Sequence, residues 1–265
     1  MNHKGNLLTT YRPQLSLLFL QVFRRNMMVF AKFWRSNVMF NFLEPLLYLA
    51  ALGTGLGIYI PEIQGMTYLE FIAPGIIVAS AMWSSSFECT YGSFIRLEIQ
   101  KTYNATITTP VSLDEVVIGD IAFGAFKSCF YGSIILLVLL ALGLISSPLT
   151  LLVPFVLLLF GIVISQLSMI WTSLAPNFEI FAYYFTLIIT PMFLISGVFF
   201  PVSNLPQPIQ WLAWLTPLFH AVELCRGFIT GMVPPLYPYH ILFLVLFALL
   251  LFFPPLILMR RRLIK

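Results

Sequence analysis

The sequence predicts an all-α membrane protein with six transmembrane helices, an N-terminal amphipathic interfacial helix and a re-entrant helical hairpin before the sixth helix. The chain of 265 residues is 60% hydrophobic and 9% charged, whereas an ordinary soluble domain is about 25% charged. It offers about six apolar runs of the roughly 20 residues that a helical crossing requires. Its basic residues gather at the two termini and in one connection between runs. Residues 1–265 are therefore predicted to form one transmembrane domain.

Residues 1–36 predict a helix that lies in the membrane surface. Gln14, Gln21, Arg25 and Lys32 recur at helical spacing and share one face, opposite a face of apolar side chains. A basic amphipathic helix of this kind lies on a bilayer rather than crossing it. We expect it to anchor the chain, to contact a partner, or both. Because charged residues precede the first apolar run, we expect no cleaved signal peptide.

The six crossings are expected at residues 38–60, 71–93, 116–143, 149–173, 180–199 and 239–259. Their orientation follows from the basic residues, because lysine and arginine near the ends of crossings stay on the cytoplasmic side. Twelve of the 14 basic residues lie in the N-terminal segment, between the second and third crossings, or in the C-terminal tail: Lys4, Arg12, Arg24, Arg25, Lys32, Arg35, Arg96, Lys101, Arg260, Arg261, Arg262 and Lys265. Both termini and that connection are therefore predicted to be cytoplasmic.

The connection at residues 94–115 is unusually polar for this chain. Charged and apolar residues alternate along it at the spacing of a short amphipathic helix, which Pro110 interrupts. Ser112 followed by Glu115 is a capping-box pattern that would start the third crossing. A plain connection needs only a handful of residues. We therefore favour a protein-binding surface over a solvated loop.

Three charged residues fall well inside the predicted crossings, away from their ends, where each costs from a few kcal/mol upward unless it is paired or hydrated. These are Glu44, Glu88 and Lys127. We predict a Glu88–Lys127 pair that joins the second and third crossings, with Glu44 nearby. A structural clamp is favoured over direct contact with a substrate. Asp120 and Glu179 lie near cytoplasmic ends and receive no special role.

Residues 200–235 are predicted to dip into the membrane from the outer side and turn back. Pro201, Pro206, Pro208 and Pro217, which lie within 17 residues, exclude one continuous spanning helix, so we expect two short helices. The first carries Trp211 and Trp214, whose rings suit a membrane interface. The second is expected to begin at Thr216 and to end at Gly227.

His220, Glu223 and Arg226 lie three residues apart and share a face of that second short helix. A metal site would need more ligands than His220 and Glu223 supply. We therefore predict no metal and favour a polar lining of the exit or a capping network.

The sequence carries no motif for nucleotide hydrolysis, since it has neither a GxxxxGK[ST] loop nor a GxGxxG after a strand. Energy for uphill movement would have to come from another subunit. Two alternatives belong to other classes of protein. A membrane-embedded transferase needs convergent acid, base or metal groups, and a passive channel needs a polar filter or a charged ring. The net charge of +4 reflects the cytoplasmic bias of the basic residues, so we expect no nucleic-acid partner.

Two blocks of the sequence resemble a known family. Residues 73–121, APGIIVASAMWSSSFECTYGSFIRLEIQKTYNATITTPVSLDEVVIGDI, resemble the permease subunits of type-2 ABC exporters, and most closely the NodJ-like subgroup associated with lipo-oligosaccharide export. Residues 195–227, ISGVFFPVSNLPQPIQWLAWLTPLFHAVELCRG, resemble the segment between the fifth and sixth crossings in the wider family. The resemblance extends over nearly the whole chain.

The resemblance implies a homodimer of permeases bound to two cytoplasmic ABC ATPase subunits in the cell inner membrane. ATP and Mg would act in the ATPase, and this chain would need no cofactor. Residues 94–115 would be the coupling segment that docks on the ATPase, with the N-terminal helix bracing it, and residues 200–235 would form an outer gate. The implied coupling positions are Arg96, Glu98, Lys101, Thr109, Pro110 and Asp114, with Arg25 and Lys32 on the bracing helix.

The subgroup resemblance alone suggests the substrate, which would be an amphipathic glycolipid such as a lipo-oligosaccharide or a lipid-linked glycan. Export of hydrophobic drugs or small molecules is the alternative within transport. The chain is unusually aromatic, with 26 phenylalanines and 11 tyrosines. Aromatic rings suit both sugars and acyl chains, but helix packing and lipid contact are their commoner uses.

Overall fold

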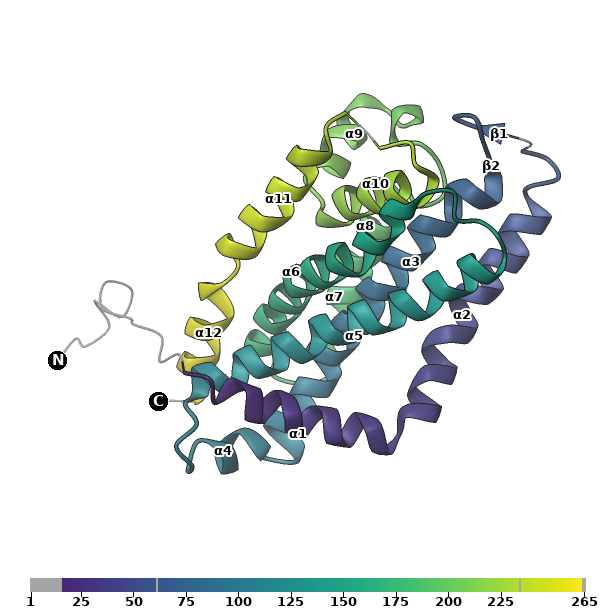
Figure 1. Ribbon diagram of the computed structural model, residues 1–265. Helices are drawn as coiled ribbons and strands as arrows, with labels where there is room; N and C mark the ends of the chain where they lie inside the picture. Colours follow the sequence, from purple (N-terminus) through teal and green to yellow (C-terminus); the bar gives the residue numbers. More distant parts are fainter. Residues whose placement is uncertain (1–15, 61, 234, 264–265) are drawn as a thin grey trace.

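The computed structural model describes residues 16–60, 62–233 and 235–263, and the fold is built from helices (Figure 1). The α-helices are α1 (Phe19–Lys32), α2 (Trp34–Gly55), α3 (Tyr68–Phe87), α4 (Thr102–Thr106), α5 (Leu113–Ala141), α6 (Val153–Leu174), α7 (Ile180–Tyr184), α8 (Thr190–Ile195), α9 (Gln207–Trp214), α10 (Pro217–Thr230), α11 (Tyr237–Leu250) and α12 (Phe253–Leu263). The start of the predicted N-terminal segment, including Gln14, lies outside the described residues.

Shorter elements complete the chain. Two π-helical segments, Glu88–Gly92 and Ile95–Ile99, follow α3, and a third, Phe185–Ile189, joins α7 to α8. Short 3-10 helices lie at Pro148–Leu152 and Val202–Asn204. The strands β1 (Glu62–Ile63) and β2 (Met66–Thr67) form a small antiparallel hairpin beside the start of α3.

Four helical stretches in the described part of the chain are long and apolar enough to cross a membrane: Tyr68–Ile99, Leu113–Ala141, Pro148–Leu174 and Tyr237–Leu263. They coincide with the second, third, fourth and sixth predicted crossings. The stretch Ile180–Ile195 is apolar but shorter, and α2 is not among the four. A helical membrane protein with four candidate crossings is therefore confirmed, whereas the count of six and the re-entrant hairpin stay predictions.

The helix that begins at Tyr68 occupies the centre of the bundle, and the last crossing lies at its edge (Figure 1). In the Tyr68–Ile99 stretch 83% of the residues that form its most apolar window are buried, and the mean hydropathy is 1.2. In Tyr237–Leu263 only 17% are buried and the mean hydropathy is 3.0. A helix surrounded by protein can carry polar groups because its neighbours satisfy them, whereas a helix facing lipid cannot. The least apolar crossing is therefore the one that protein covers most completely.

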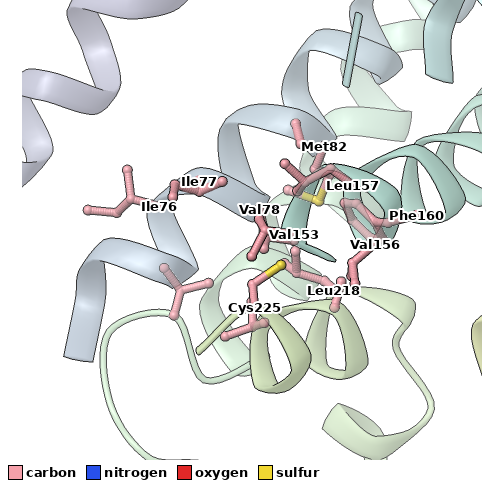
Figure 2. Close-up of a cluster of buried hydrophobic side chains, with 14 of the residues drawn as sticks. Ile76, Ile77, Val78, Met82, Val153, Val156, Leu157, Phe160, Leu218 and Cys225 are labelled. Carbon is pink, nitrogen blue, oxygen red and sulfur yellow. The ribbon is translucent and has the colours of Figure 1, made fainter. Parts of the chain in front are cut away.

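The core lies where α3, α6 and α10 meet (Figure 2). Ile77, Val78 and Met82 of α3 pack there with residues from the other two helices, and the cluster includes Leu157 and Cys225. Most of its side chains are branched aliphatic groups, which pack densely with few voids. This cluster fixes the middle of α3 against two neighbouring helices.

Small residues allow α5 and α6 to approach closely. A Cβ atom on Gly161 of α6 would lie 2.5 Å from the Cβ of Ser128 on α5, and one on Gly124 of α5 would overlap the hydroxyl of Ser165 on α6. Ser128 Oγ donates a hydrogen bond to the carbonyl of Leu157 at 3.0 Å. Close contact of this kind replaces the hydrophobic driving force that helices lack in lipid.

Several predicted boundaries are confirmed and one is wrong. Ser112 and Glu115 form the predicted capping box at the start of α5, and the Thr216 hydroxyl caps α10 by accepting from Phe219 N. However, α10 does not end at Gly227. It continues to Thr230, where Gly231 has a φ of 81° and closes the helix in the left-handed conformation that favours glycine.

The close approach of α5 and α6 makes Gly161 sensitive to substitution. We expect Gly161→Ala to lower the free energy of unfolding by about 1–3 kcal/mol, because the added methyl group overpacks the contact with Ser128. Gly55→Ala is the matched control, since a Cβ there meets no atom within 4 Å. Thermal unfolding in detergent measures both variants. Equal stability of the two would contradict the close packing of α5 on α6.

Candidate functional site

The continuation of α3 beyond Phe87 carries the charged residues of the candidate site. This stretch contains two π-helical segments, and each π-turn changes which side chains face a neighbouring helix. Such insertions occur frequently at functional sites. Here Glu88, Ser93 and Arg96 all make contacts with charged residues of α5. The π-helical end of α3 thus presents a polar surface to α5.

The carboxylate of Asp120, on α5, is the centre of a buried polar network. It accepts hydrogen bonds from Arg96 Nε at 3.1 Å and from Tyr103 OH at 2.6 Å. Ser93 Oγ donates to it at 2.9 Å, and Asn26 Nδ2 donates to its second oxygen at 2.7 Å. These donors come from the π-helical end of α3, from α4 and from α1. Four segments of the chain therefore meet at one carboxylate, which is fully buried.

Tyr103 reaches this carboxylate from the connection between two crossings, because α4 turns its ring into the protein. Burial raises the pKa of Tyr103 well above its ordinary value, and the charge of Asp120 acts in the same direction. The phenol therefore keeps its proton and donates to Asp120. A side chain in the polar connection is thereby fixed to the third crossing.

Glu88 is shared by two cations. Lys127 Nζ donates to one carboxylate oxygen at 2.9 Å, and an Arg96 terminal nitrogen donates to the other at 2.7 Å. The pairing of Glu88 with Lys127 that the sequence predicted is therefore present, and it joins the π-helical end of α3 to α5. Gly92 leaves room for it, since a Cβ there would lie 2.9 Å from a Glu88 carboxylate oxygen.

The charged groups of this network depend on one another. An unpaired charge within a bilayer is costly. When one partner of a buried ion pair is removed, the remaining charge is left uncompensated, which typically costs about 3–5 kcal/mol. Glu88, Arg96, Asp120 and Lys127 are all largely covered. The network is therefore a joint that resists separation of the helices it connects.

Two residues implied to lie on the coupling surface face the interior instead. The Arg96 guanidinium is bound by the carboxylates of Glu88 and Asp120. Asp114 is buried at the start of α5, with its carboxylate 4.0 Å from Arg260. The structure corrects the placement of both residues. The π-helical segment orients Arg96 towards α5. Asp114 is buried in the first turn of α5, directly after the Ser112 cap.

The other coupling positions lie at the surface. Lys101, Thr109 and Pro110 are exposed. Glu98 is partly exposed and binds Lys101 at 3.0 Å and Arg262 at 2.8 Å. These residues surround the short helix α4, which lies at one end of the bundle with the start of α1 and the end of α12 (Figure 1).

The N-terminal helix α1, to which the resemblance assigns a bracing role, contacts α4. Arg25 donates to Thr106 Oγ1 of α4 at 3.2 Å, and Ser16 donates through its hydroxyl and backbone N–H to Glu115 at the start of α5. Lys32 is exposed at the far end of α1, and its bracing role stays a prediction.

The C-terminal helix α12 is also tied to this end of the bundle. Arg262 donates to the carbonyl of Thr172 at 2.6 Å and to Glu98 at 2.8 Å. Thr172 lies in the last turn of α6, where unpaired carbonyls attract a cation. Arg262 thus connects residues 94–115 with the ends of α6 and α12.

Glu44 is exposed on α2 and lines a cavity of about 460 Å³ together with Lys127. The lining is mixed, since Trp83 and Phe87 of α3 lie beside Ser80 and Ser84. The ring of Phe87 stacks on Phe185 with centroids 4.6 Å apart, which extends the aromatic surface to the fifth apolar stretch. The cavity therefore offers both charged and aromatic contacts.

The opposite end of the bundle holds the residues of the implied outer gate. Trp211 and Trp214 are exposed on α9. Arg226 is buried, and it donates to the carbonyl of Gly197 at 2.6 Å and to Glu223 at 2.6 Å. Its guanidinium lies 3.9 Å from the centroid of the Phe71 ring. Arg226 thus holds segments together, as in the capping network that was one of the two roles the sequence left open.

His220 contacts a different set of groups from the Glu223–Arg226 pair. Its Nε2 donates to the carbonyl of Trp214 at 2.8 Å, and its Nδ1 lies 2.7 Å from Nδ1 of His240. With both rings neutral, His240 must be the donor in that second contact. Among the residues that the structure describes, no group of three or more His, Cys, Asp or Glu side chains is placed to hold a metal ion.

Sequence reasoning missed the centre of the network. Asp120 received no role because its position near a cytoplasmic end made it look solvated. The capping signal at Ser112 starts α5 two turns before Asp120, and that spacing was the only available hint of its burial. Asn26, Ser93 and Tyr103 carried no signal, since polar residues of these types occur widely on surfaces.

Because Glu88 contacts both Lys127 and Arg96, substitutions of Glu88 and of Lys127 should lower stability by different amounts. Glu88→Gln leaves the Lys127 ammonium without a carboxylate, so we expect the free energy of unfolding to fall by about 3–5 kcal/mol. Lys127→Met leaves Glu88 paired with Arg96 and should cost less. The double variant should be more stable than Glu88→Gln alone. Thermal unfolding of the four proteins measures this cycle, and equal losses in the two single variants would contradict the shared carboxylate.

Comparison with known proteins identifies the family. The family model described as ABC-2 type transporter matches residues 18–230. Nodulation protein J of Rhizobium meliloti (strain 1021) is 36% identical over 245 residues, covering 92% of this chain and 94% of that protein. Nodulation protein J of Rhizobium leguminosarum bv. trifolii is 35% identical over 256 residues, covering 97% and 98%.

A more distant relative carries a transport name. The inner membrane transport permease YadH of Escherichia coli (strain K12) is 22% identical over 194 residues, which cover 73% of this chain and 75% of that protein. The family matches, together with the apolar crossings, indicate a transport permease. The chain belongs to the ABC-2 type transporter family and is a membrane permease of an ABC exporter, whose ATPase is a separate subunit.

Proposed function

We propose that this permease moves a lipo-oligosaccharide or lipid-linked glycan out of the cytoplasm, driven by two ABC ATPase subunits that dock on the exposed part of residues 94–115. Two copies of the chain would form the pathway in the inner membrane. ATP and Mg act in the ATPase. The observation that carries this proposal is the connection between an exposed polar segment and the crossings through the carboxylate of Asp120.

The exposed surface around α4 has the composition of a docking site. Ile99 is 62% exposed and Ile107 is 37% exposed, although both lie in the most polar connection of the chain. Lys101 and Thr109 are exposed beside them. Apolar side chains rimmed by polar groups are typical of surfaces that contact another protein. These residues therefore supply the contact area, and the buried Arg96 transmits movement instead of binding the partner.

The orientation follows from the positions of the basic residues. Lys101, the Arg24–Arg25 pair and the Arg260–Arg262 run all lie at the end of the bundle that carries α4 (Figure 1). Basic residues favour the cytoplasmic side. We infer that this end and both termini are cytoplasmic, and that α9 and the hairpin of β1 and β2 lie outside.

In this orientation the remaining helices complete the proposed membrane fold. We infer that α2 and Ile180–Ile195 supply the first and fifth crossings. Residues 200–235 would then dip in from the outer side through α9 and α10, with Trp211 and Trp214 at the interface, where aromatic rings are favoured. This segment serves as the outer gate in the proposed mechanism.

The proposed mechanism is a two-state coupling. Closure of the ATPase dimer on ATP moves the docked surface around α4. Tyr103 and Arg96 pass this movement to Asp120 on α5, and the Ser112 cap makes the start of α5 part of the same unit. ATP shifts the permease between states only to the extent that the ATP-bound ATPase binds the two states with different affinity. A firm joint between the docking surface and the crossings is therefore required.

The cavity beside α2 supports an amphipathic substrate. Trp83 and Phe87 provide flat apolar faces on which sugar rings or acyl chains pack, while Glu44, Ser80 and Ser84 provide polar contacts. The similarity to nodulation protein J favours a glycolipid within this class.

Labelling in intact cells tests the orientation. We expect a membrane-impermeant thiol reagent to label Tyr59→Cys in intact cells and to label Thr108→Cys only after permeabilisation. Both positions are exposed, and they lie at opposite ends of the bundle. Labelling of Thr108→Cys in intact cells would place α4 outside and remove the basis for cytoplasmic docking.

Deletion of the chain tests the substrate. Cells that lack it should accumulate a glycolipid on the inner face of the membrane, and expression of the intact chain with its ATPase should clear it. Accumulation of a hydrophobic small molecule without any change in glycolipid would favour the drug-exporter alternative. Activity of the chain without an ATPase would favour a channel or a transferase instead.

A further inference from the structure

A second cavity, of about 330 Å³, lies where α1 crosses the π-helical end of α3. Three cations and one carboxylate line it, and aliphatic and aromatic side chains of α1 form one edge. The residues that matter here are Arg25, Glu88, Arg96, Lys127, Val29 and Phe33. The cavity belongs to the end of the bundle that carries α4 and the basic residues.

The charges around this cavity do not balance. The ion pairs of the network involve three cations, Arg25, Arg96 and Lys127, and two carboxylates, Glu88 and Asp120. Among the ion pairs of the described residues, one positive charge is therefore left over in a region that protein largely covers. Excess charge in such a region is costly unless an opposite charge or water compensates it.

Arg25 is the least compensated of the three cations. Its nearest carboxylate oxygen, on Asp120, is 3.9 Å away, whereas Arg96 and Lys127 reach theirs at 2.7 Å and 2.9 Å. Burial lowers the pKa of the Arg25 guanidinium, while the charge of Asp120 opposes that change. The side chain is still 28% exposed, so part of it is accessible from the cavity.

The edge formed by α1 is apolar and open. Val29 is 59% exposed and Phe33 is 55% exposed, and both line the cavity. An amphipathic helix with this character lies at the boundary between headgroups and acyl chains. A cationic floor beside an exposed apolar edge matches a ligand that has an anionic head and a hydrocarbon tail.

We propose that this cavity binds the phosphate headgroup of an anionic phospholipid, with Arg25 as its principal ligand and the acyl chains lying against Val29 and Phe33. A guanidinium fits phosphate oxygens with two parallel hydrogen bonds, and basic pockets between membrane helices on the cytoplasmic side bind anionic headgroups. The lipid supplies the missing negative charge. It also fixes α1 against the network that α1 shares with α4, so inner-leaflet composition would influence the coupling joint.

The test uses two adjacent arginines of the full-length chain. Arg25→Gln and Arg24→Gln each remove one positive charge from α1, but Arg24 is exposed and does not line the cavity. The measurement is the dissociation constant for a fluorescent phosphatidylglycerol in phosphatidylcholine bilayers. At about 1 M salt, where the Debye length is about 3 Å, attraction to exposed charges is largely screened.

We expect Arg25→Gln to weaken phosphatidylglycerol binding about tenfold, as for loss of a charge-assisted hydrogen bond, and Arg24→Gln to leave it unchanged at high salt. Equal effects of the two variants would show general surface attraction and overturn the site. So would an unmodified chain that prefers phosphatidylglycerol no more than phosphatidylcholine.

Inorganic phosphate, added as a competitor, distinguishes a site for a lipid headgroup from a site for free phosphate. Phosphate that fails to displace the lipid at equal concentration supports a lipid site. Displacement at equal concentration would show a site for the free anion and overturn the lipid assignment.

A second pair of variants keeps the proposal testable if Arg25→Gln fails to fold. Val29→Ser changes only the exposed apolar edge and is expected to weaken binding about threefold, through loss of apolar contact. Met28→Ser is the control, because Met28 is exposed on α1 outside the cavity. Equal binding by these two variants would contradict the placement of the acyl chains.

Discussion

One buried carboxylate organises the end of the bundle at which we propose that the ATPase docks. Asp120 accepts hydrogen bonds from α1, from the π-helical end of α3 and from α4. Because an ionised carboxylate is costly inside a membrane protein, each of these donors contributes to keeping it there. The same contacts determine where α4 sits relative to the crossings. The stability of the joint and its ability to transmit movement therefore have one physical origin.

The arrangement of helices protects this joint from lipid. The helix that begins at Tyr68 is covered by protein over most of its length, whereas Tyr237–Leu263 is the most apolar crossing and the least covered. Close contact through Gly161 and Ser128 places α6 against α5, and Arg262 ties the last helix to the end of α6. The polar network can exist because apolar helices surround it, and it holds those helices in one arrangement.

Patterns that depend on local sequence were predicted well. The capping box at Ser112 and the cap at Thr216 are local, and both are present. The Glu88–Lys127 pair was found because a bilayer makes isolated charges costly, which limits the possible partners. The depths of the two residues along their crossings then indicated that their side chains could meet.

What could not be predicted depends on geometry that arises only in the folded chain. The π-helical turns direct Arg96 towards Asp120, and neither apolar periodicity nor a capping pattern reveals a π-turn. The burial of Tyr103 depends on where α4 is placed by its neighbours. Similarly, the sequence left open whether Arg226 lines an exit or belongs to a capping network, because only the folded structure shows which backbone carbonyls it reaches.

The contact of Tyr103 with Asp120 is the step on which the proposed coupling depends most directly. The decisive measurement is the number of substrate molecules exported per ATP hydrolysed, compared between the unmodified permease, Tyr103→Phe and the exposed control Tyr59→Phe. Phenylalanine keeps the ring but loses the hydroxyl that donates to Asp120. We expect Tyr103→Phe to bind the ATPase and sustain hydrolysis while export per ATP falls, with Tyr59→Phe unchanged. Undiminished export per ATP in Tyr103→Phe would contradict a joint built on Asp120.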